Sequence, residues 1–225
     1  MVAWAFVDLG GTLWDETPWH AFLYRTYADV LAEAGHPVPL EALRARLEAL
    51  VRDHVSAFTR AYVLEQVPDD GAATAILREV SRRTRDRAGE LQPLLPGALE
   101  VLDDLRRDHH VGILANQPAT VRPHLEGTGV AARAEFVFLS GEVHLSKPDR
   151  AFYRTALERA GVPPSEAVMV GDRIDNDVVP AKAVGMRTVR VRSSAYGIQE
   201  PRCESERPDV EVARLDEVPA AVRRL

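Results

Sequence analysis

The sequence predicts an α/β fold in which a parallel sheet has helices on both faces and carries an inserted, all-helical segment. Three observations predict it. From Pro93 onward, short apolar runs rich in β-branched residues alternate with helical patterns, as strands and helices do in parallel sheets. An apolar run near the N-terminus ends in an acid and two glycines. Residues 17 to about 90 show helical periodicity and no strand signal of any length.

The first predicted strand is the apolar run from Ala3 to Val7. It stops at Asp8, and Gly10 and Gly11 follow at once, a pattern typical of a buried strand that opens into a tight loop. A carboxylate in such a loop can face a bound substrate. An isolated acid before glycines more often caps a turn, so the choice depends on what the other strands carry.

The helical segment shows apolar residues at three- and four-residue spacing, as at Trp19, Phe22 and Leu23. Turn signals at residues 35–37 and 68–71 divide the segment into about four helices. We therefore expect a helical insertion between the first strand and the rest of the sheet.

The remaining strands are expected where β-branched apolar runs occur, with helices between them. Because helices between parallel strands cover both faces of a sheet, this alternation completes the predicted fold. The predicted strands are 110–114, 135–139, 167–170, 187–191 and 209–213, and the predicted helices are 98–107, 151–160 and 177–184.

Composition narrows the functional class. The chain has 225 residues, of which 46% are hydrophobic, and a formal net charge of −6, so it can bury a large core and has no electrostatic reason to bind nucleic acid. No apolar stretch is long enough to cross a membrane and no signal peptide is apparent, so we expect a cytoplasmic protein. The single cysteine, Cys203, rules out an internal disulfide.

Polar side chains gather where four of the predicted strands end or where the loops after them begin. In a parallel sheet these positions share one edge, where ligands bind. The groups are a carboxylate, a small residue followed by an amide, a lysine and a cluster of acids. The residues are Asp8; Ala115 and Asn116; Lys147, between Ser146 and Pro148; and Asp172, Asp175 and Asp177.

In these four sites the chain resembles the haloacid dehalogenase superfamily. The family motifs are Asp-x-Asp-x-Thr, a Thr or Ser, Lys-Pro, and Gly-Asp followed five residues later by Asp, and they correspond to these sites in order and spacing. The resemblance implies a Rossmann-like hydrolase core made of residues 1–14 and 93–225. It also implies that residues 15–92 form a helical cap of the kind that many members insert after the first strand.

The resemblance implies a Mg²⁺-dependent phosphatase. Asp8 would be the nucleophile that forms an aspartyl-phosphate, and Lys147 would hold the phosphate and neutralise the carboxylates. The metal ligands would be Asp8, the backbone carbonyl of Gly10 and Asp172, with Asp177 in support and Asp175 as a nearby alternative. The phosphate would contact Gly11, Thr12, Ala115, Asn116 and Lys147.

Two residues depart from the family motifs. Gly10 stands where phosphatases usually carry a second Asp, which serves as general acid and then as base; losing such a group ordinarily costs about 10²- to 10⁴-fold in rate. Ala115 stands where the family presents a hydroxyl to the phosphate, although the backbone N–H of Asn116 can still donate. His20 is a candidate replacement acid, because its ordinary pKa of about 6.5 suits proton transfer.

The same residues distinguish this chain from other branches of the family. Phosphonate-cleaving members need a lysine in the cap, and no lysine occurs between residues 1 and 146, which excludes that chemistry. Dehalogenase members carry a bulky aromatic residue in place of the second Asp and need no metal, so the acids at 172–177 disfavour that activity. A binding or regulatory protein that keeps the fold but has weakened catalysis stays an alternative. The expected partner is a small phosphorylated metabolite, because a cap that closes over the site favours small substrates.

Overall fold

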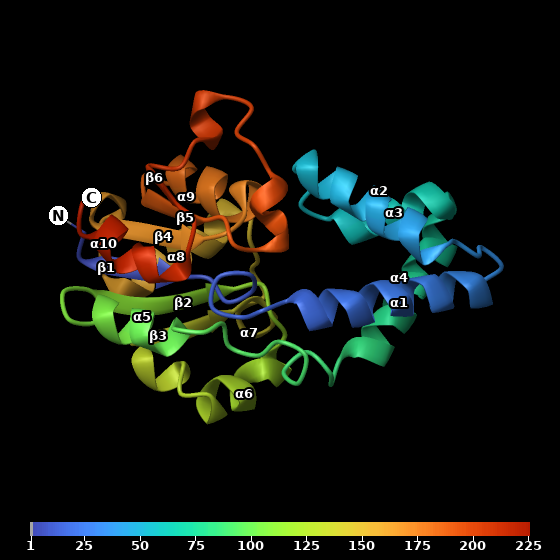
Figure 1. The fold of residues 1–225 in the computed structure, drawn as a ribbon, viewed down its shortest axis with the longest axis horizontal. Coiled ribbons are helices and arrows are strands. Elements are labelled where there is room, and N and C mark those ends of the chain that lie inside the picture. Colours follow the sequence, from blue (N-terminus) through green and yellow to red (C-terminus); the bar gives the residue numbers. More distant parts are fainter. Residues whose placement is uncertain (1) are drawn as a thin grey trace. The chain divides into compact units, whose positions relative to one another are not determined.

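The computed structural model describes residues 2–225 and divides into two compact units, residues 2–15 with 93–225 and residues 16–92 (Figure 1). The larger unit contains a six-stranded sheet in the order β3-β2-β1-β4-β5-β6, and every strand pair in it is parallel. This confirms the predicted α/β fold with a parallel sheet and a helical insertion. The strands are β1 (Trp4–Val7), β2 (His110–Ala115), β3 (Phe136–Leu139), β4 (Ala167–Gly171), β5 (Arg187–Val191) and β6 (Val210–Val212).

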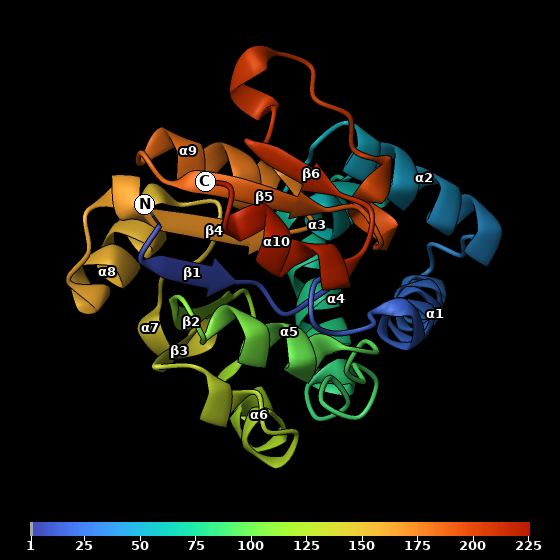
Figure 2. The ribbon, with the colours of Figure 1, turned by 60° about the vertical axis from the view of Figure 1, so that its left-hand side comes forward.

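Helices cover both faces of this sheet (Figure 2). On one face α5 (Ala98–Leu105) packs with α10 (Val218–Val222), and on the other α8 (Arg150–Ala160) packs with α9 (Val179–Ala183). Two shorter helices, α6 (Arg122–Gly127) and α7 (Ser140–Val143), follow β2 and β3.

The core beneath α8 and α9 is built from large apolar side chains of strands and helices alike. Phe6 of β1, Phe138 of β3 and Met169 of β4 pack with Phe152 and Tyr153 of α8, and all five are buried. Burial of apolar surface contributes about 25 cal/mol per Å², so this packing is the main force that holds α8 against the sheet.

The smaller unit is all-helical, as the sequence indicates. Its helices are α1 (Thr17–Glu33), α2 (Leu40–Arg52), α3 (Phe58–Gln66) and α4 (Asp70–Thr84). Asp69 caps α4 by accepting a hydrogen bond of 2.7 Å from the backbone N–H of Ala72. The helical pattern was expected to reach about residue 90, but α4 ends at Thr84 and turns follow.

One predicted helix has a different form. The segment expected to be helical from Asp177 begins three residues earlier with a wide π-type turn, Ile174–Val178, and only then becomes α9. The backbone N–H of Val178 donates to the carbonyl of Arg173 over five residues, and the Asp177 side chain accepts a hydrogen bond of 3.1 Å from the Arg173 N–H. Such turns are frequent at functional sites.

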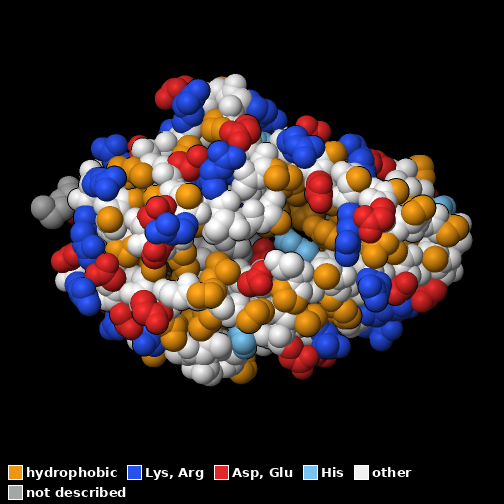
Figure 3. All heavy atoms as spheres, in the orientation of Figure 1, with side chains coloured by type: hydrophobic (Ala, Val, Ile, Leu, Met, Phe, Trp, Pro, Cys, Tyr) orange, Lys and Arg blue, Asp and Glu red, His pale blue; other side chains and the backbone are white. Residues whose placement is uncertain are grey.

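Surface charge is mixed on the face drawn in Figure 3. Lys and Arg side chains alternate with Asp and Glu over each unit instead of gathering by sign. This face therefore has no continuous basic stripe of the kind that follows a nucleic-acid backbone. No helix among the described residues is both long enough and apolar enough to cross a membrane.

Candidate active site

The parallel register brings the predicted site residues to one edge of the sheet. Val7, the last residue of β1, pairs with Ile113 of β2 on one side and with Val170 of β4 on the other. The backbone N–H of Asp8 continues this ladder by donating to the carbonyl of Val170 at 2.9 Å. Asp8 and Asp172 therefore leave adjacent strands at the same level.

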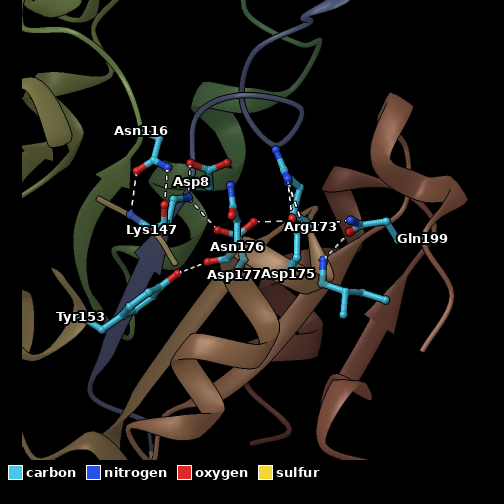
Figure 4. Close-up of polar contacts among 10 residues, drawn as sticks. Asp8, Asn116, Lys147, Tyr153, Arg173, Asp175, Asn176, Asp177 and Gln199 are labelled. Carbon is cyan, nitrogen blue, oxygen red and sulfur yellow. Dashed lines mark hydrogen bonds and ion pairs between the residues drawn. The ribbon is translucent and has the colours of Figure 1, made fainter. Parts of the chain in front are cut away.

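Lys147 joins Asp8, in the loop after β1, to Asp177, in the segment after β4 (Figure 4). Its Nζ donates to Asp8 Oδ1 at 2.7 Å and to Asp177 Oδ1 at 2.6 Å. The side chains of Lys147 and Asp177 are only 2% and 1% exposed. Hydrogen bonds between charged groups are among the stronger ones, and these two fix the ammonium between two carboxylates.

Asn116 holds Lys147 in place through its amide. Asn116 Nδ2 donates to the Lys147 carbonyl at 2.8 Å, and the Lys147 N–H donates to Asn116 Oδ1 at 2.9 Å. This paired contact uses both ends of the amide. It shows a supporting function for the side chain that the sequence did not reveal, while the predicted phosphate contact concerns the backbone N–H of Asn116.

Position 11 must be glycine, because Asp172 lies too close to leave room for a side chain. A Cβ there would lie 2.0 Å from Asp172 Oδ2, and Gly11 has a φ of +67°, a conformation that other residues rarely adopt. Gly171 is similarly crowded, since a Cβ there would lie 2.3 Å from Asp177 Cγ. The loop after β1 can approach Asp172 and Asp177 this closely only because positions 11 and 171 have no side chain.

Three buried carboxylates could hold a metal ion. Oxygen atoms of Asp8, Asp172 and Asp177 lie within 4.8 Å of one another, and such hard oxygen donors suit Mg²⁺. Asp177 already accepts hydrogen bonds from Lys147 and from the Arg173 N–H, which fits an indirect contact with an ion better than a direct one. The donor set therefore fits a hard divalent cation.

Asp175, the alternative to Asp177, is used elsewhere. Its Oδ1 accepts hydrogen bonds of 3.0 Å from Arg173 Nε and 2.9 Å from Gln199 Nε2. Arg173 also lies over the ring of Tyr196, 4.6 Å from its centre. Asp175 thus belongs to a buried network beside the site, and Asp177 is the acid that joins the cluster.

Further buried side chains hold the backbone of the segment after β4, and no sequence motif predicts them. Arg190, on β5, donates to the carbonyl of Asp172 at 3.1 Å and to that of Tyr196 at 3.0 Å. The hydroxyl of Tyr153 donates to the carbonyl of Asn176 within the π-type turn. These contacts fix the backbone on each side of the predicted metal ligands.

The other predicted phosphate contacts are less accessible. Thr12 and Ala115 are fully buried, and the Thr12 hydroxyl has no hydrogen-bond partner among the described residues. Ala115 ends β2 with no hydroxyl to offer. Gly10 lies in the same loop and forms a bridge with Trp14, and its carbonyl as a metal ligand stays a prediction.

Burial shifts the ionisation of the central pair. The pKa of Asp8 is raised from 3.8 to about 7, chiefly because burial disfavours its charged form, with Lys147 acting in the opposite direction and Asp177 adding to the rise. The pKa of Lys147 is raised, because the attraction of Asp177 and Asp8 outweighs the burial that opposes it. Lys147 therefore keeps its proton, and a bound cation would favour ionised Asp8.

This shift predicts a pH-dependent stability in protein freed of metal with EDTA. The pKa of the Asp8 carboxyl is 3.8 as a reference and about 7 in the fold. Between these values the folded state holds a proton that the unfolded state has lost, so the free energy of unfolding decreases as pH rises through this window. Urea unfolding from about pH 5 to about pH 8 should show the wild type losing stability relative to Asp8→Asn until about pH 7 and then staying level. If the free energy of unfolding of the wild type instead increases relative to Asp8→Asn as pH rises, the raised pKa of Asp8 is contradicted.

Comparison with known proteins gives a consistent family. The model of the haloacid dehalogenase-like hydrolases matches residues 2–185. The chain is 29% identical over 231 residues to a glyceraldehyde 3-phosphate phosphatase of Methanopyrus kandleri, covering 100% of this chain and 99% of that protein. It is 37% identical over 198 residues to a phosphoserine phosphatase of Thermus thermophilus, covering 83% and 76%.

A solved structure extends the comparison. The crystal structure of a 2-haloacid dehalogenase from Pseudomonas syringae pv. Tomato DC3000 is 27% identical, with a TM-score of 0.64 over 100% of this chain and 99% of that one. Phosphatases and a dehalogenase thus both resemble this chain, and the site residues must decide between them.

Proposed function

The chain belongs to the haloacid dehalogenase-like hydrolases, and we propose that it is a Mg²⁺-dependent phosphatase acting on a small phosphorylated metabolite through an aspartyl-phosphate on Asp8. The observation that carries the proposal is the buried constellation of Lys147 between Asp8 and Asp177, with Asp172 beside them. The names of the two phosphatase relatives support the same substrate class.

Asp8 is the proposed nucleophile. Its carboxylate attacks phosphorus in line with the leaving oxygen, and Lys147, which donates to Asp8 Oδ1, places a positive charge beside the phosphoryl group. Phosphoryl transfer depends on positioning and on charge stabilisation of this kind. The amide of Asn116 keeps Lys147 at the site by holding its backbone.

The metal would be held by Asp8 and Asp172, with the Gly10 carbonyl as a further ligand and Asp177 in support. When bound, Mg²⁺ supplies positive charge that offsets the charge of the phosphate and of the surrounding carboxylates. Arg190 fixes the backbone at Asp172, and Asp177 is oriented by Lys147 and the Arg173 N–H. We assign the catalytic machinery to residues 1–14 and 93–225, and a cap function to residues 15–92.

The acid cluster favours a phosphatase over the dehalogenase alternative. Dehalogenation needs no cation, whereas Asp8, Asp172 and Asp177 bring three carboxylates within 4.8 Å, where mutual repulsion raises the free energy unless positive charge is present. Lys147 supplies one such charge, and Mg²⁺ would supply the rest. Release of halide from 2-chloropropionate in EDTA, without hydrolysis of 4-nitrophenyl phosphate, would favour the dehalogenase.

Asp172→Asn is expected to weaken Mg²⁺ binding at least about tenfold, because one charged ligand becomes a neutral amide. Isothermal titration of EDTA-treated protein with MgCl₂ measures this directly, and hydrolysis of 4-nitrophenyl phosphate should require Mg²⁺ and fall in parallel. Asp29→Asn, on an exposed position of α1, is the matched control. Equal Mg²⁺ affinity in Asp172→Asn and Asp29→Asn contradicts the assigned site.

A binding or regulatory protein is the second candidate, and Gly10 and Ala115 favour it. An aryl phosphate has a good leaving group and hardly needs an acid, whereas an alkyl phosphate does. If Mg²⁺ binds with the affinity change described but neither kind of phosphate is hydrolysed, this second candidate replaces the phosphatase.

A further inference from the structure

Position 10 leaves the nucleophile loop with no side chain two residues after Asp8. Gly10 is half-buried, and its neighbours Leu9 and Leu13 are fully buried apolar residues. Gly11 is pressed against Asp172 and has no room for a side chain. The hydroxyl of Thr12 is buried and neutral. Residues 9 to 14 therefore present no acidic or imidazole side chain that can give a proton to a departing oxygen.

Three proton carriers of the larger unit bind Asp8 or the loop that follows β4, and each already has a partner. Lys147 donates to Asp8 and Asp177. The Tyr153 hydroxyl donates to the Asn176 carbonyl, and Arg173 is paired with Asp175. The protons of these three groups are therefore directed at partners within the protein.

We infer that this site, on the premise of the phosphatase function proposed above, acts on acyl phosphates, in which phosphate is joined to a carboxyl group and the leaving group departs as a stable anion. A leaving carboxylate needs no proton from the enzyme. An enzyme that lacks a proton donor is thus matched to this substrate class by its own residues.

The two steps balance without an acid. In the first, an Asp8 oxygen forms a bond to phosphorus, the bond between phosphorus and the leaving oxygen breaks, and the carboxylate departs with the electron pair. In the second, water attacks phosphorus of the aspartyl-phosphate, the bond between phosphorus and the Asp8 oxygen breaks, the Asp8 carboxylate is released with the electron pair, and both protons of the water leave on inorganic phosphate as H₂PO₄⁻. No oxidant, reductant or further reactant is required.

The basicity of the leaving group sets the expected difference in rate between acyl, aryl and alkyl phosphates. A carboxylic acid has a pKa of about 4 and a phenol about 10, while an alcohol is about as weak an acid as water and far weaker than a phenol. A general acid makes the hydrolysis rate depend much less on the basicity of the leaving group. For a basic leaving group it raises the rate about 10²- to 10⁴-fold. Without one, the rate is expected to fall steeply from acyl to aryl to alkyl phosphates.

A preference for acyl phosphates distinguishes this chain from the phosphatases that it resembles. Glyceraldehyde 3-phosphate and phosphoserine, which appear in the names of the two relatives, are both alkyl phosphates. We expect both to be poor substrates of this chain compared with an acyl phosphate of similar size.

The test measures kcat/KM of the full chain with Mg²⁺ for acetyl phosphate, phosphoserine and a set of ring-substituted phenyl phosphates. The phenyl series keeps the shape of the substrate nearly constant while its leaving-group basicity changes. Spontaneous hydrolysis of acetyl phosphate is subtracted with Asp8→Asn as the blank. We expect acetyl phosphate to exceed phosphoserine by at least about 10²-fold, and the phenyl series to slow steadily as the phenol becomes more basic.

Gly10→Asp supplies the missing carboxyl. The backbone at Gly10 does not have the positive φ that Gly11 has. We expect the ratio of kcat/KM for acetyl phosphate over phosphoserine to fall about 10²- to 10⁴-fold in this variant. If the variant does not fold, the slope of the phenyl series in the wild type decides by itself.

His20→Ala tests whether the helical unit supplies an acid. His20 lies in α1, 3.9 Å from Glu16 and stacked on Tyr24. A shallow phenyl series in the wild type that becomes steep in His20→Ala overturns the inference, because His20 is then the proton donor.

The remaining outcomes are distinct. A steep series with acetyl phosphate preferred supports the inference. Equal rates for acyl and alkyl phosphates, all lost in Asp8→Asn, overturn it while the phosphatase function stands. Hydrolysis of none of these compounds overturns the phosphatase function and the inference with it.

Discussion

Asp8→Asn is expected to reduce phosphate ester hydrolysis at least about 10⁴-fold, because the amide cannot form the aspartyl-phosphate. The fold should persist. Asparagine has nearly the same shape, its amide oxygen can still accept the hydrogen bond from Lys147 Nζ, and the substitution removes a carboxylate whose ionised form burial disfavours. Hydrolysis of 4-nitrophenyl phosphate and the circular dichroism spectrum measure the two effects separately.

Asp29→Asn is the matched control for this prediction, since it makes the same chemical change on an exposed helix position. It should keep wild-type turnover. If Asp8→Asn keeps turnover within a few-fold of Asp29→Asn, Asp8 is not the nucleophile.

Lys147→Met is expected to lower the free energy of unfolding by about 3 to 5 kcal/mol in EDTA, because it leaves two buried carboxylates without their counter-charge. Both partners, Asp8 and Asp177, lie within 2.7 Å of the ammonium. Turnover should also be lost, since the phosphoryl group loses the positive charge beside it. Urea unfolding followed by circular dichroism measures the stability change.

The chain offers a close control, because Lys147 and Lys182 are its only lysines. Lys182 donates to the carbonyl of Arg207 at 2.6 Å from a half-buried position, so Lys182→Met should cost only about 1 kcal/mol. Adding Asp177→Asn to Lys147→Met should recover part of the lost stability. Equal stability of Lys147→Met and Lys182→Met would contradict the buried charge cluster.

The sequence predicted the sheet well because parallel strands buried on both faces appear as continuous apolar runs. All six expected runs, including the short one that gives Val210–Val212, are strands of the sheet, with ends displaced by at most one residue. The ends shift because hydrogen bonding to a neighbouring strand, as between Ala115 and Leu139, decides where a strand stops. Local sequence does not contain this pairing.

The site was predicted less completely. The four motifs indicated which groups meet, and Asp8, Lys147, Asp172 and Asp177 do lie together. The choice of Asp177 over Asp175 depends on the π-type turn and on the bonds of Asp175 to Arg173 and Gln199.

The supporting side chains were not predicted at all. Arg190 and Tyr153 reach backbone carbonyls 18 and 23 residues away. An isolated arginine or tyrosine in a sequence carries no sign of such a long-range contact.

The central claim is a covalent phosphoryl group on Asp8, and reductive trapping tests it most directly. Enzyme turning over acetyl phosphate or 4-nitrophenyl phosphate with Mg²⁺ is quenched with borohydride, which reduces an acyl phosphate but leaves a free carboxylate intact. Mass spectrometry of the peptide that contains position 8 should then show homoserine in place of aspartate, only when substrate is present. Unmodified aspartate at position 8 in enzyme quenched during burst turnover, or homoserine at another acid, would contradict the account.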